Sequence, residues 1–234
     1  MPRSKIPEYK VFKKEVFDNI TSAEKNLLFY WSLTDISSWE EVPPSYYPNS
    51  DAGHRKVIQI LEKSPCIKKI IEEDREYFMK RFVMGEFLTN FLLAAELELI
   101  LENAWKLDLV NLRRAVFPDV VFNNNGKVVS IEIKGMISAS NLKQRINDDV
   151  LPYLSDGVCD NFLLLLLFLV CPNDNPDRVN QLIEGYYVYE ALVSEKDKRR
   201  QVFCQCFTED KDTEGKYSLE KLASRIVENY FSKT

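Results

Sequence analysis

Two carboxylates and an amine lie close together in the segment PDVVFNNNGKVVSIEIKG. Asp119 follows a proline, whereas Glu132 and Lys134 lie beyond the dipeptide Asn125-Gly126. An Asn-Gly dipeptide between two alternating apolar stretches is a strong signal for a two-residue hairpin turn. The segment therefore predicts a β-hairpin that carries Asp119 on its first strand and Glu132 and Lys134 on its second.

The turn also predicts how the two strands pair. If the dipeptide forms the turn, Asn124 pairs with Lys127, and Asp119 then lies opposite Glu132. Directly opposed residues share one face of a hairpin, with Cβ atoms roughly 5 Å apart, and Lys134 belongs to the same face. We expect that face to be exposed. The apolar residues on the opposite face, which we expect to point into the core, are Val129, Ile131 and Ile133.

Two carboxylates at that separation repel each other by about 3 kcal/mol at an effective dielectric near 20. Either the pair shares a proton or a cation lies between the two groups. Oxygen ligands on adjacent strands suit Mg²⁺, which binds one or two carboxylates and keeps several waters for a substrate phosphate and a nucleophile. The alternative is a solvated face on which Lys134 simply pairs with Glu132 across the strand.

The elements around the hairpin follow from apolar periodicity and capping signals. One predicted helix begins at Thr21 or Ser22. Another covers 56–73, with a break at Pro65, and further helices are predicted over 77–105, 141–154, 177–194 and 218–231. A loop is predicted over 41–52. Predicted strands cover 107–112, 115–122, 127–134, 161–171 and 201–207. The continuous apolar run in 161–171 indicates a central strand covered on both faces. The order predicts an α/β fold, with a sheet that has helices on both sides.

The motif Pro118-Asp119 followed by Glu132-Ile133-Lys134 resembles the signature of the PD-(D/E)xK nuclease superfamily, which has the restriction-endonuclease-like fold. The core of that family is a helix, three strands, a helix and a strand around a mixed central sheet. The resemblance covers roughly residues 80 to 171. It implies a nuclease core over 77–234, with a C-terminal strand and helix, and a helical N-terminal extension over 1–76 packed on that core.

The resemblance implies a role for each residue of the motif. Asp119 and Glu132 would bind a divalent metal, the backbone carbonyl of Ile133 would complete its shell, and Lys134 would assist the attacking water. The expected metal is Mg²⁺, with Mn²⁺ able to substitute. Many members of the family add a carboxylate from the preceding helix, and Glu86 in Met-Gly-Glu resembles that position.

Glu86 lies on one helical stripe with Asn90, Leu93, Leu97 and Ile100. A glutamate in the first turn of a helix is also favoured by the helix dipole alone, so both interpretations stay open. Other carboxylates of the same helix compete for this role, namely Glu96, Glu98 and Glu102.

The chain contains a second copy of the pattern, Pro176-Asp177 followed by Glu214 and Lys216. Here Asp177 begins a predicted helix, and Glu214 lies in a polar loop. The pattern at Asp119 instead lies on two apolar strands joined by a turn, which favours it as the active site.

A net charge of −5 argues against a protein that coats nucleic acid without specificity, although local basic clusters exist. Arg113 and Arg114 directly precede the motif and are best placed to reach a phosphate. Residues of the helix after Lys134 are further candidates for DNA binding, against the alternative of an exposed helical face: Lys143, Gln144 and Arg145.

These observations predict a Mg²⁺-dependent endonuclease that hydrolyses double-stranded DNA. Among members of the superfamily, a compact chain of this length most resembles a type II restriction endonuclease, which implies a homodimer. One alternative is a repair, recombination or transposition nuclease that recognises DNA structure. Another is a nuclease-like module that only binds nucleic acid or a protein partner.

Other common sites have little support in the sequence. His54 is the only histidine, and the five cysteines lack zinc-site spacing, which fits a reducing compartment. The N-terminus lacks the apolar stretch of a signal peptide, and the apolar run 162–170 is too short to span a bilayer as a helix. We therefore expect a cytoplasmic protein without a membrane segment.

Overall fold

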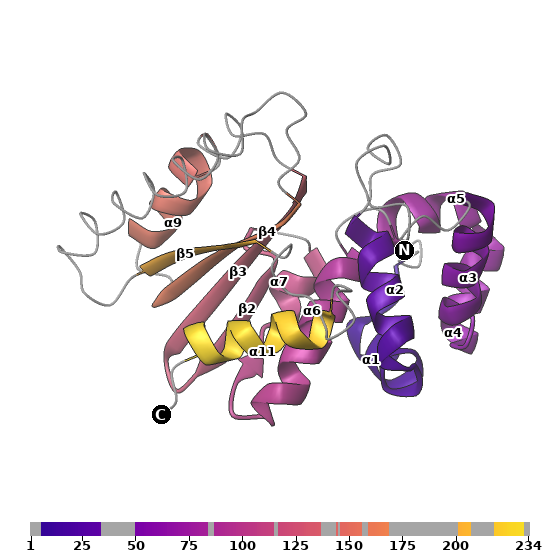
Figure 1. Ribbon diagram of the computed structural model, residues 1–234, viewed down its shortest axis with the longest axis horizontal. Helices are drawn as coiled ribbons and strands as arrows, with labels where there is room; N and C mark the ends of the chain where they lie inside the picture. Colours follow the sequence, from indigo (N-terminus) through magenta and orange to yellow (C-terminus); the bar gives the residue numbers. More distant parts are fainter. Residues whose placement is uncertain are drawn as a thin grey trace.

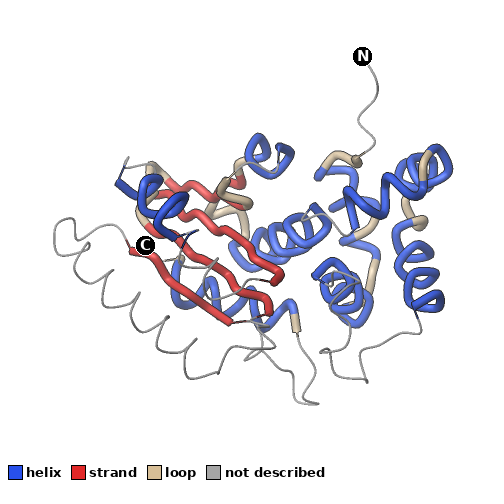
Figure 2. Tube along the Cα trace, turned by 90° about the horizontal axis from the view of Figure 1, so that it is seen from above, coloured by secondary structure: helices blue, strands red, loops and turns tan. Residues whose placement is uncertain are grey.

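The computed structural model describes residues 6–33, 50–83, 87–114, 117–136, 144, 146–155, 159–168, 201–206 and 218–231. The described strands form one mixed sheet in the order β1-β2-β3-β4-β5. Helices lie on both sides of this sheet (Figures 1 and 2). The predicted α/β class, with a mixed sheet flanked by helices, is therefore confirmed.

The five strands differ in length and direction. They are β1 Lys106–Leu107, β2 Val120–Asn124, β3 Lys127–Met136, β4 Asn161–Phe168 and β5 Gln201–Cys206. Strand β2 pairs antiparallel with both β1 and β3, whereas β3-β4 and β4-β5 are parallel. Strand β3 is thus the boundary between the antiparallel and the parallel half of the sheet.

The predicted hairpin is confirmed in turn type and in register. Asn125 and Gly126 have φ values of 51° and 89°, the left-handed conformations that a type I′ turn requires. Asn124 pairs with Lys127, and the ladder continues to Val120 opposite Ile131.

The N-terminal helices are α1 Tyr9–Glu15, α2 Ser22–Leu33, α3 Ser50–Leu61, α4 Pro65–Glu73 and α5 Arg75–Phe78, with a 3-10 turn at Phe17–Asn19. Thr21 starts α2 with a reciprocal capping box, since its hydroxyl accepts from Glu24 N and its own N–H donates to Glu24 Oε2. The predicted break at Pro65 is confirmed. The loop predicted over 41–52 is wrong at its end, because α3 already begins at Ser50; residues 41–49 lie outside the described residues.

The helix predicted over 77–105 is divided. A π-helical turn at Met79–Val83 follows α5, and α6 covers Phe87–Leu101. Helix α6 ends at Leu101 because Glu102 and Asn103 adopt positive φ values of 47° and 65°. Residues 84–86, which include Glu86, lie outside the described residues.

The strand predicted over 107–112 is wrong for most of its length. Only Lys106–Leu107 pairs in the sheet, and helix α7 occupies Leu109–Arg114. Asp108 causes the change, since its Oδ1 accepts the N–H of Val110 at 2.8 Å and so caps the new helix. The strand predicted over 115–122 begins only at Val120.

The second half of the chain follows the predicted order where it is described. A π-helical turn at Ile146–Val150 and helix α9 Leu151–Ser155 fall within the helix predicted over 141–154. Helix α11, Leu219–Tyr230, is the predicted closing helix, capped by Ser218. The helix predicted over 177–194 lies outside the described residues.

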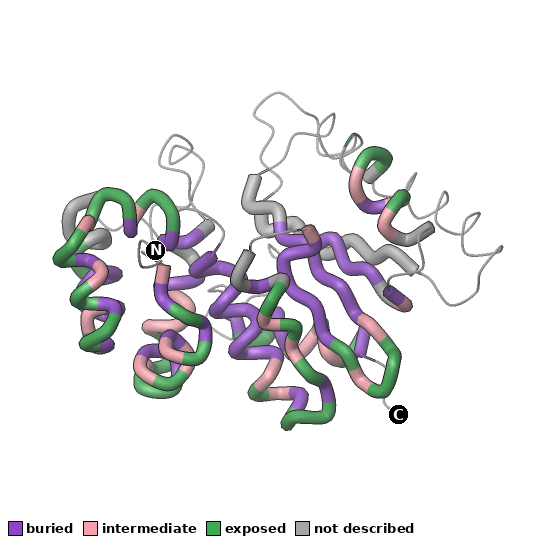
Figure 3. Tube along the Cα trace, turned by 180° about the vertical axis from the view of Figure 1, so that it is seen from behind, coloured by how far each residue is buried: buried purple, intermediate pink, exposed green. Residues whose placement is uncertain are grey.

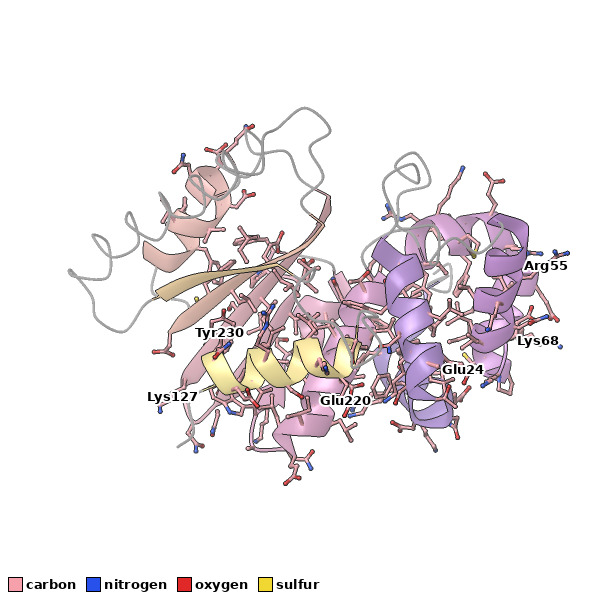
Figure 4. All side chains as sticks on the ribbon, viewed as in Figure 1. Glu24, Arg55, Lys68, Lys127, Glu220 and Tyr230 are labelled. Carbon is pink, nitrogen blue, oxygen red and sulfur yellow. The ribbon has the colours of Figure 1, made fainter. Side chains whose placement is uncertain are left out.

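Helices α6 and α11 cover one face of the sheet and α9 the other (Figure 1). Helix α6 is buried almost throughout, with residues from Phe87 to Leu97 at most 9% exposed (Figure 3). Strand residues such as Phe122 and Ile131 pack in the same core as α6. The N-terminal helices extend this core away from the sheet, and Arg55 of α3 and Lys68 of α4 project from the far end (Figure 4).

Among the described helices, none has the length and apolar character needed to cross a membrane.

A buried ion pair joins the N-terminal helices to α6. Lys25 Nζ lies 3.2 Å from Glu96 Oε2 and 3.7 Å from the centre of the Phe17 ring. Burial raises the pKa of Glu96, against the opposing effect of Lys25. The folded protein therefore binds a proton at Glu96 more tightly than the unfolded chain, and the contribution of this group to stability falls as the pH rises through the raised pKa.

We expect Lys25→Met to destabilise the fold by ~3 kcal/mol at neutral pH, because it leaves the charge of Glu96 buried and uncompensated. In acid, where Glu96 is protonated, the loss should be much smaller. Urea unfolding of both proteins at neutral pH and near pH 4 measures the difference. An equal loss at both pH values would contradict this account.

We expect Gly126→Ala to destabilise the fold by about 1–2 kcal/mol, since an L-residue is strained at positive φ. No atom lies within 4 Å of the added Cβ, so the penalty comes from the backbone conformation and not from a clash. Asn125→Gly, which keeps the left-handed turn available, is the matched control and should stay within about 0.5 kcal/mol. Denaturant unfolding of both variants tests the turn.

Candidate metal centre

The carboxylate of Asp119 extends the β2-β3 ladder by one step. The last backbone pair of the two strands is Val120 with Ile131. Beyond it, Asp119 Oδ2 accepts the backbone N–H of Ile133 at 2.7 Å, so a side chain takes the place of a backbone acceptor. This contact holds Asp119 against β3, one residue from Glu132.

A second contact holds the same carboxylate from the helix layer. Asn90 of α6 donates from Nδ2 to Asp119 Oδ1 at 3.1 Å. Asn90 is completely buried and Asp119 is 3% exposed. Each oxygen of Asp119 therefore accepts at least one hydrogen bond, and an ionised carboxylate offers about four acceptor positions in all.

Glu132 lies on β3 directly before Ile133, and its side chain is 5% exposed. The observed register agrees with the predicted proximity of Glu132 and Asp119. The prediction that this face is exposed is wrong. Helix α9 and the π-helical turn before it cover the face, where Phe117, Val150, Tyr153 and Phe162 pack together; Ser130, two residues before Glu132 on β3, is completely buried.

The covering layer is aromatic and continuous with the site. The ring of Phe117 stacks on Phe162 at 5.5 Å and meets Tyr153 edge-on at 5.4 Å. The hydroxyl of Tyr153 lies 3.3 Å from Ser130 Oγ on β3, and burial raises the pKa of Tyr153. Phe117 stands two residues before Asp119, so this cluster fixes the chain where it enters the site.

The backbone of Ile133 is oriented toward Asp119. In an antiparallel ladder, the N–H and the C=O of one residue point to the same neighbouring strand. Because the N–H of Ile133 binds Asp119, its carbonyl faces the same side of β3. Lys134 follows in β3, and its side chain lies outside the described residues.

These donors fit a hard divalent cation. Two carboxylates and a carbonyl are oxygen ligands, which suit Mg²⁺ or Mn²⁺ better than Zn²⁺. Within the described ranges, no cluster of three or more His, Cys, Asp or Glu side chains could hold a metal ion. Mg²⁺ in proteins uses only one or two carboxylates and keeps several waters, so this pair is sufficient.

Asn90 carries the clearest sign of an absent ligand. Its Oδ1 is buried and has no hydrogen-bond partner within the described part of the chain. A buried acceptor left without a donor costs about 1–3 kcal/mol. A hydrated cation beside Asp119 would supply the donor through one of its waters, so the residues present fit the metal.

The described residues do not test the predicted DNA-binding residues. Gln144 is exposed, and Lys143 and Arg145 lie outside the described residues. Arg113 and Arg114 belong to the last turn of α7, and their side chains are not described. The involvement of these five residues in DNA binding stays a prediction.

Sequence reasoning noted Asn90 only as a member of the Glu86 stripe and assigned it no function. The available signal was a single amide in the apolar run FLTNFLLAA. A buried polar side chain needs a hydrogen-bond partner, so an asparagine in such a helix indicates a polar group on the facing element.

Comparison of the chain with protein-family models, curated proteins and solved structures gives no match.

We expect Tyr153→Ala to destabilise the protein by about 2–3 kcal/mol, because the change removes the ring contacts with Phe117 and Phe162. This loss is smaller than that for a fully buried aromatic ring, since Tyr153 is only partly buried. Tyr153→Phe keeps the ring and loses only the long contact to Ser130, so it should cost less than about 1 kcal/mol. Thermal and urea unfolding measure both variants. Equal losses would show that the hydroxyl, and not the ring, supports this layer.

Proposed function

We propose that this chain is a Mg²⁺-dependent endonuclease that hydrolyses DNA phosphodiester bonds, with a restriction-endonuclease-like core. One observation carries the proposal. The carboxylate of Asp119 accepts the backbone N–H of Ile133, the residue directly after the buried Glu132, in the register that the motif predicts.

The mixed sheet adds support. A helix, α6, precedes the hairpin β2-β3, and β4 returns parallel to β3 after a helical crossover. Apart from helix α7 between β1 and β2, this order is compatible with the one that the resemblance to the PD-(D/E)xK superfamily implies. Glu132 lies on β3, and Asp119 directly precedes β2 and is hydrogen-bonded to Asn90 of the buried helix α6, so both carboxylates are mounted on the packed scaffold.

Each residue has a defined task in hydrolysis. Asp119, Glu132 and the carbonyl of Ile133 would hold the cation. When bound, the cation supplies an activated water and neutralises charge on the phosphate. Lys134, next along β3, would orient the attacking water or donate to the phosphate oxygens as negative charge develops on them. Water adds across the P–O bond, which leaves one phosphate end and one hydroxyl end.

The restriction role is the more specific part of the proposal. A type II restriction endonuclease acts as a homodimer on double-stranded DNA, because two sites related by two-fold symmetry cut the two strands of a palindrome. The acidic composition favours a selective enzyme over an indiscriminate one.

A digest of supercoiled plasmid with Mg²⁺ tests this function. Discrete bands support a restriction enzyme. Cleavage of only branched or nicked substrates would instead indicate a repair nuclease, and the absence of cleavage with retained DNA binding would indicate a non-catalytic module.

We expect Asp119→Asn and Lys134→Ala to lower the cleavage rate by at least about 10³-fold, since each removes a group from the metal site or the transition state. DNA affinity in Ca²⁺, measured by fluorescence anisotropy, should remain. The matched control is Asp160→Asn, because Asp160 also accepts a backbone N–H of β3, that of Val128 at 2.8 Å, but at the far end of the strand.

Cleavage by Asp160→Asn should match that of the unaltered protein. Normal turnover in Asp119→Asn or Lys134→Ala would refute the assignment of these residues.

A further inference from the structure

We infer that Asn90 is part of the metal centre, as a positioning residue that fixes Asp119 through Nδ2 and accepts a hydrogen bond from a metal-bound water through Oδ1. This inference rests on the proposed function and deepens it, because neither the motif nor its resemblance assigns a role to Asn90.

The first observation is the contact itself. Asn90 Nδ2 lies 3.1 Å from Asp119 Oδ1, and both side chains are buried. Carboxylates that bind metals are usually oriented by such hydrogen bonds from residues behind them. With Ile133 N–H on the other oxygen, Asp119 is held in one orientation before any cation binds.

The second observation is independent of that contact. Asn90 Oδ1 is fully buried, and the described part of the chain gives it no hydrogen-bond donor. A buried polar atom in this state indicates a missing partner. The oxygen shares its carbon with the nitrogen that touches Asp119, so the partner must lie close to the Asp119 carboxylate.

The helix context makes a purely structural role a poor explanation. The neighbours of Asn90 on α6 include Phe91, Leu92 and Leu93, all in the apolar core. A leucine at position 90 would fill a similar volume but would remove the donor to Asp119. The contact with Asp119 accounts for Nδ2, and the buried Oδ1 is the part of the amide that it does not account for.

Thr89 offers a matched control on the same helix. It is also buried, and its hydroxyl donates to Ser32 Oγ of α2 at 2.7 Å, away from Asp119. A change at Thr89 perturbs a buried hydrogen bond of α6 without touching the metal centre.

The test is isothermal titration of the full chain with Mn²⁺, without DNA. We expect Asn90→Leu and Asn90→Ala to weaken Mn²⁺ binding by about 10–100-fold. Asn90→Asp keeps an oxygen at this place but loses the Nδ2 donor to Asp119, so it should bind Mn²⁺ less tightly than the unaltered protein and more tightly than Asn90→Leu. Thr89→Val should leave the affinity unchanged. Circular dichroism identifies any variant that fails to fold.

The outcomes separate the inference from the function. If Asn90→Leu binds Mn²⁺ normally while Asp119→Asn does not, Asn90 only packs, and the nuclease proposal stands. Equal loss in Asn90→Asp and Asn90→Leu would also overturn the role of the oxygen. If the unaltered protein binds no Mn²⁺, both proposals fail. Binding that depends on Asn90 in a protein that cuts no DNA would support the metal centre alone.

Discussion

The hydrogen bond from Ile133 N–H to Asp119 Oδ2, at 2.7 Å, is the contact on which the candidate site depends. This hydrogen bond holds the Asp119 carboxylate, which lies beyond the last pair of the β2-β3 ladder, against the edge of β3. The carbonyl of Ile133 points to the same side of β3 as its N–H, toward Asp119. Glu132 is adjacent in sequence, so this backbone contact ties Asp119 to the segment of β3 that carries Glu132. The sheet register supplies the rest, because the ladder between β2 and β3 allows no slip without breaking the type I′ turn.

The burial of this site has an electrostatic consequence. Asp119 and Glu132 are 3% and 5% exposed, and isolated ionised carboxylates are costly to remove from water. Hydrogen bonds from Asn90 and Ile133 orient the Asp119 carboxylate. Burial argues against a solvated charged face, which was the alternative to a metal site.

The sequence predicted the parts of the fold that depend on local chemistry. The Asn-Gly turn, the break at Pro65 and the cap at Thr21 are each set by a few adjacent residues, and the structure confirms them. The exposure of the face that carries Glu132 was predicted wrongly, because it depends on packing by α9, which lies outside the hairpin. The short apolar run after Leu107 formed a helix and not a strand, since the capping oxygen of Asp108 outweighed the apolar pattern. The hydrogen bond between Asn90 and Asp119 could not be predicted from the sequence, because the prediction would need to know which side of α6 faces β2.

Asn90 and β3 both belong to the packed interior of the fold. Helix α6 packs in the central core, and β3 is hydrogen-bonded on both edges, to β2 and to β4. Donors mounted on such elements lose little conformational freedom when a cation binds, so less of the binding free energy is spent on ordering them. Polar side chains buried on α6 have partners on neighbouring elements, as Thr89 has in Ser32 and Glu96 in Lys25, and Nδ2 of Asn90 has Asp119. Asn90, Asp119 and β3 therefore form one hydrogen-bonded unit, and the proposed binding of a hydrated metal ion would depend on it.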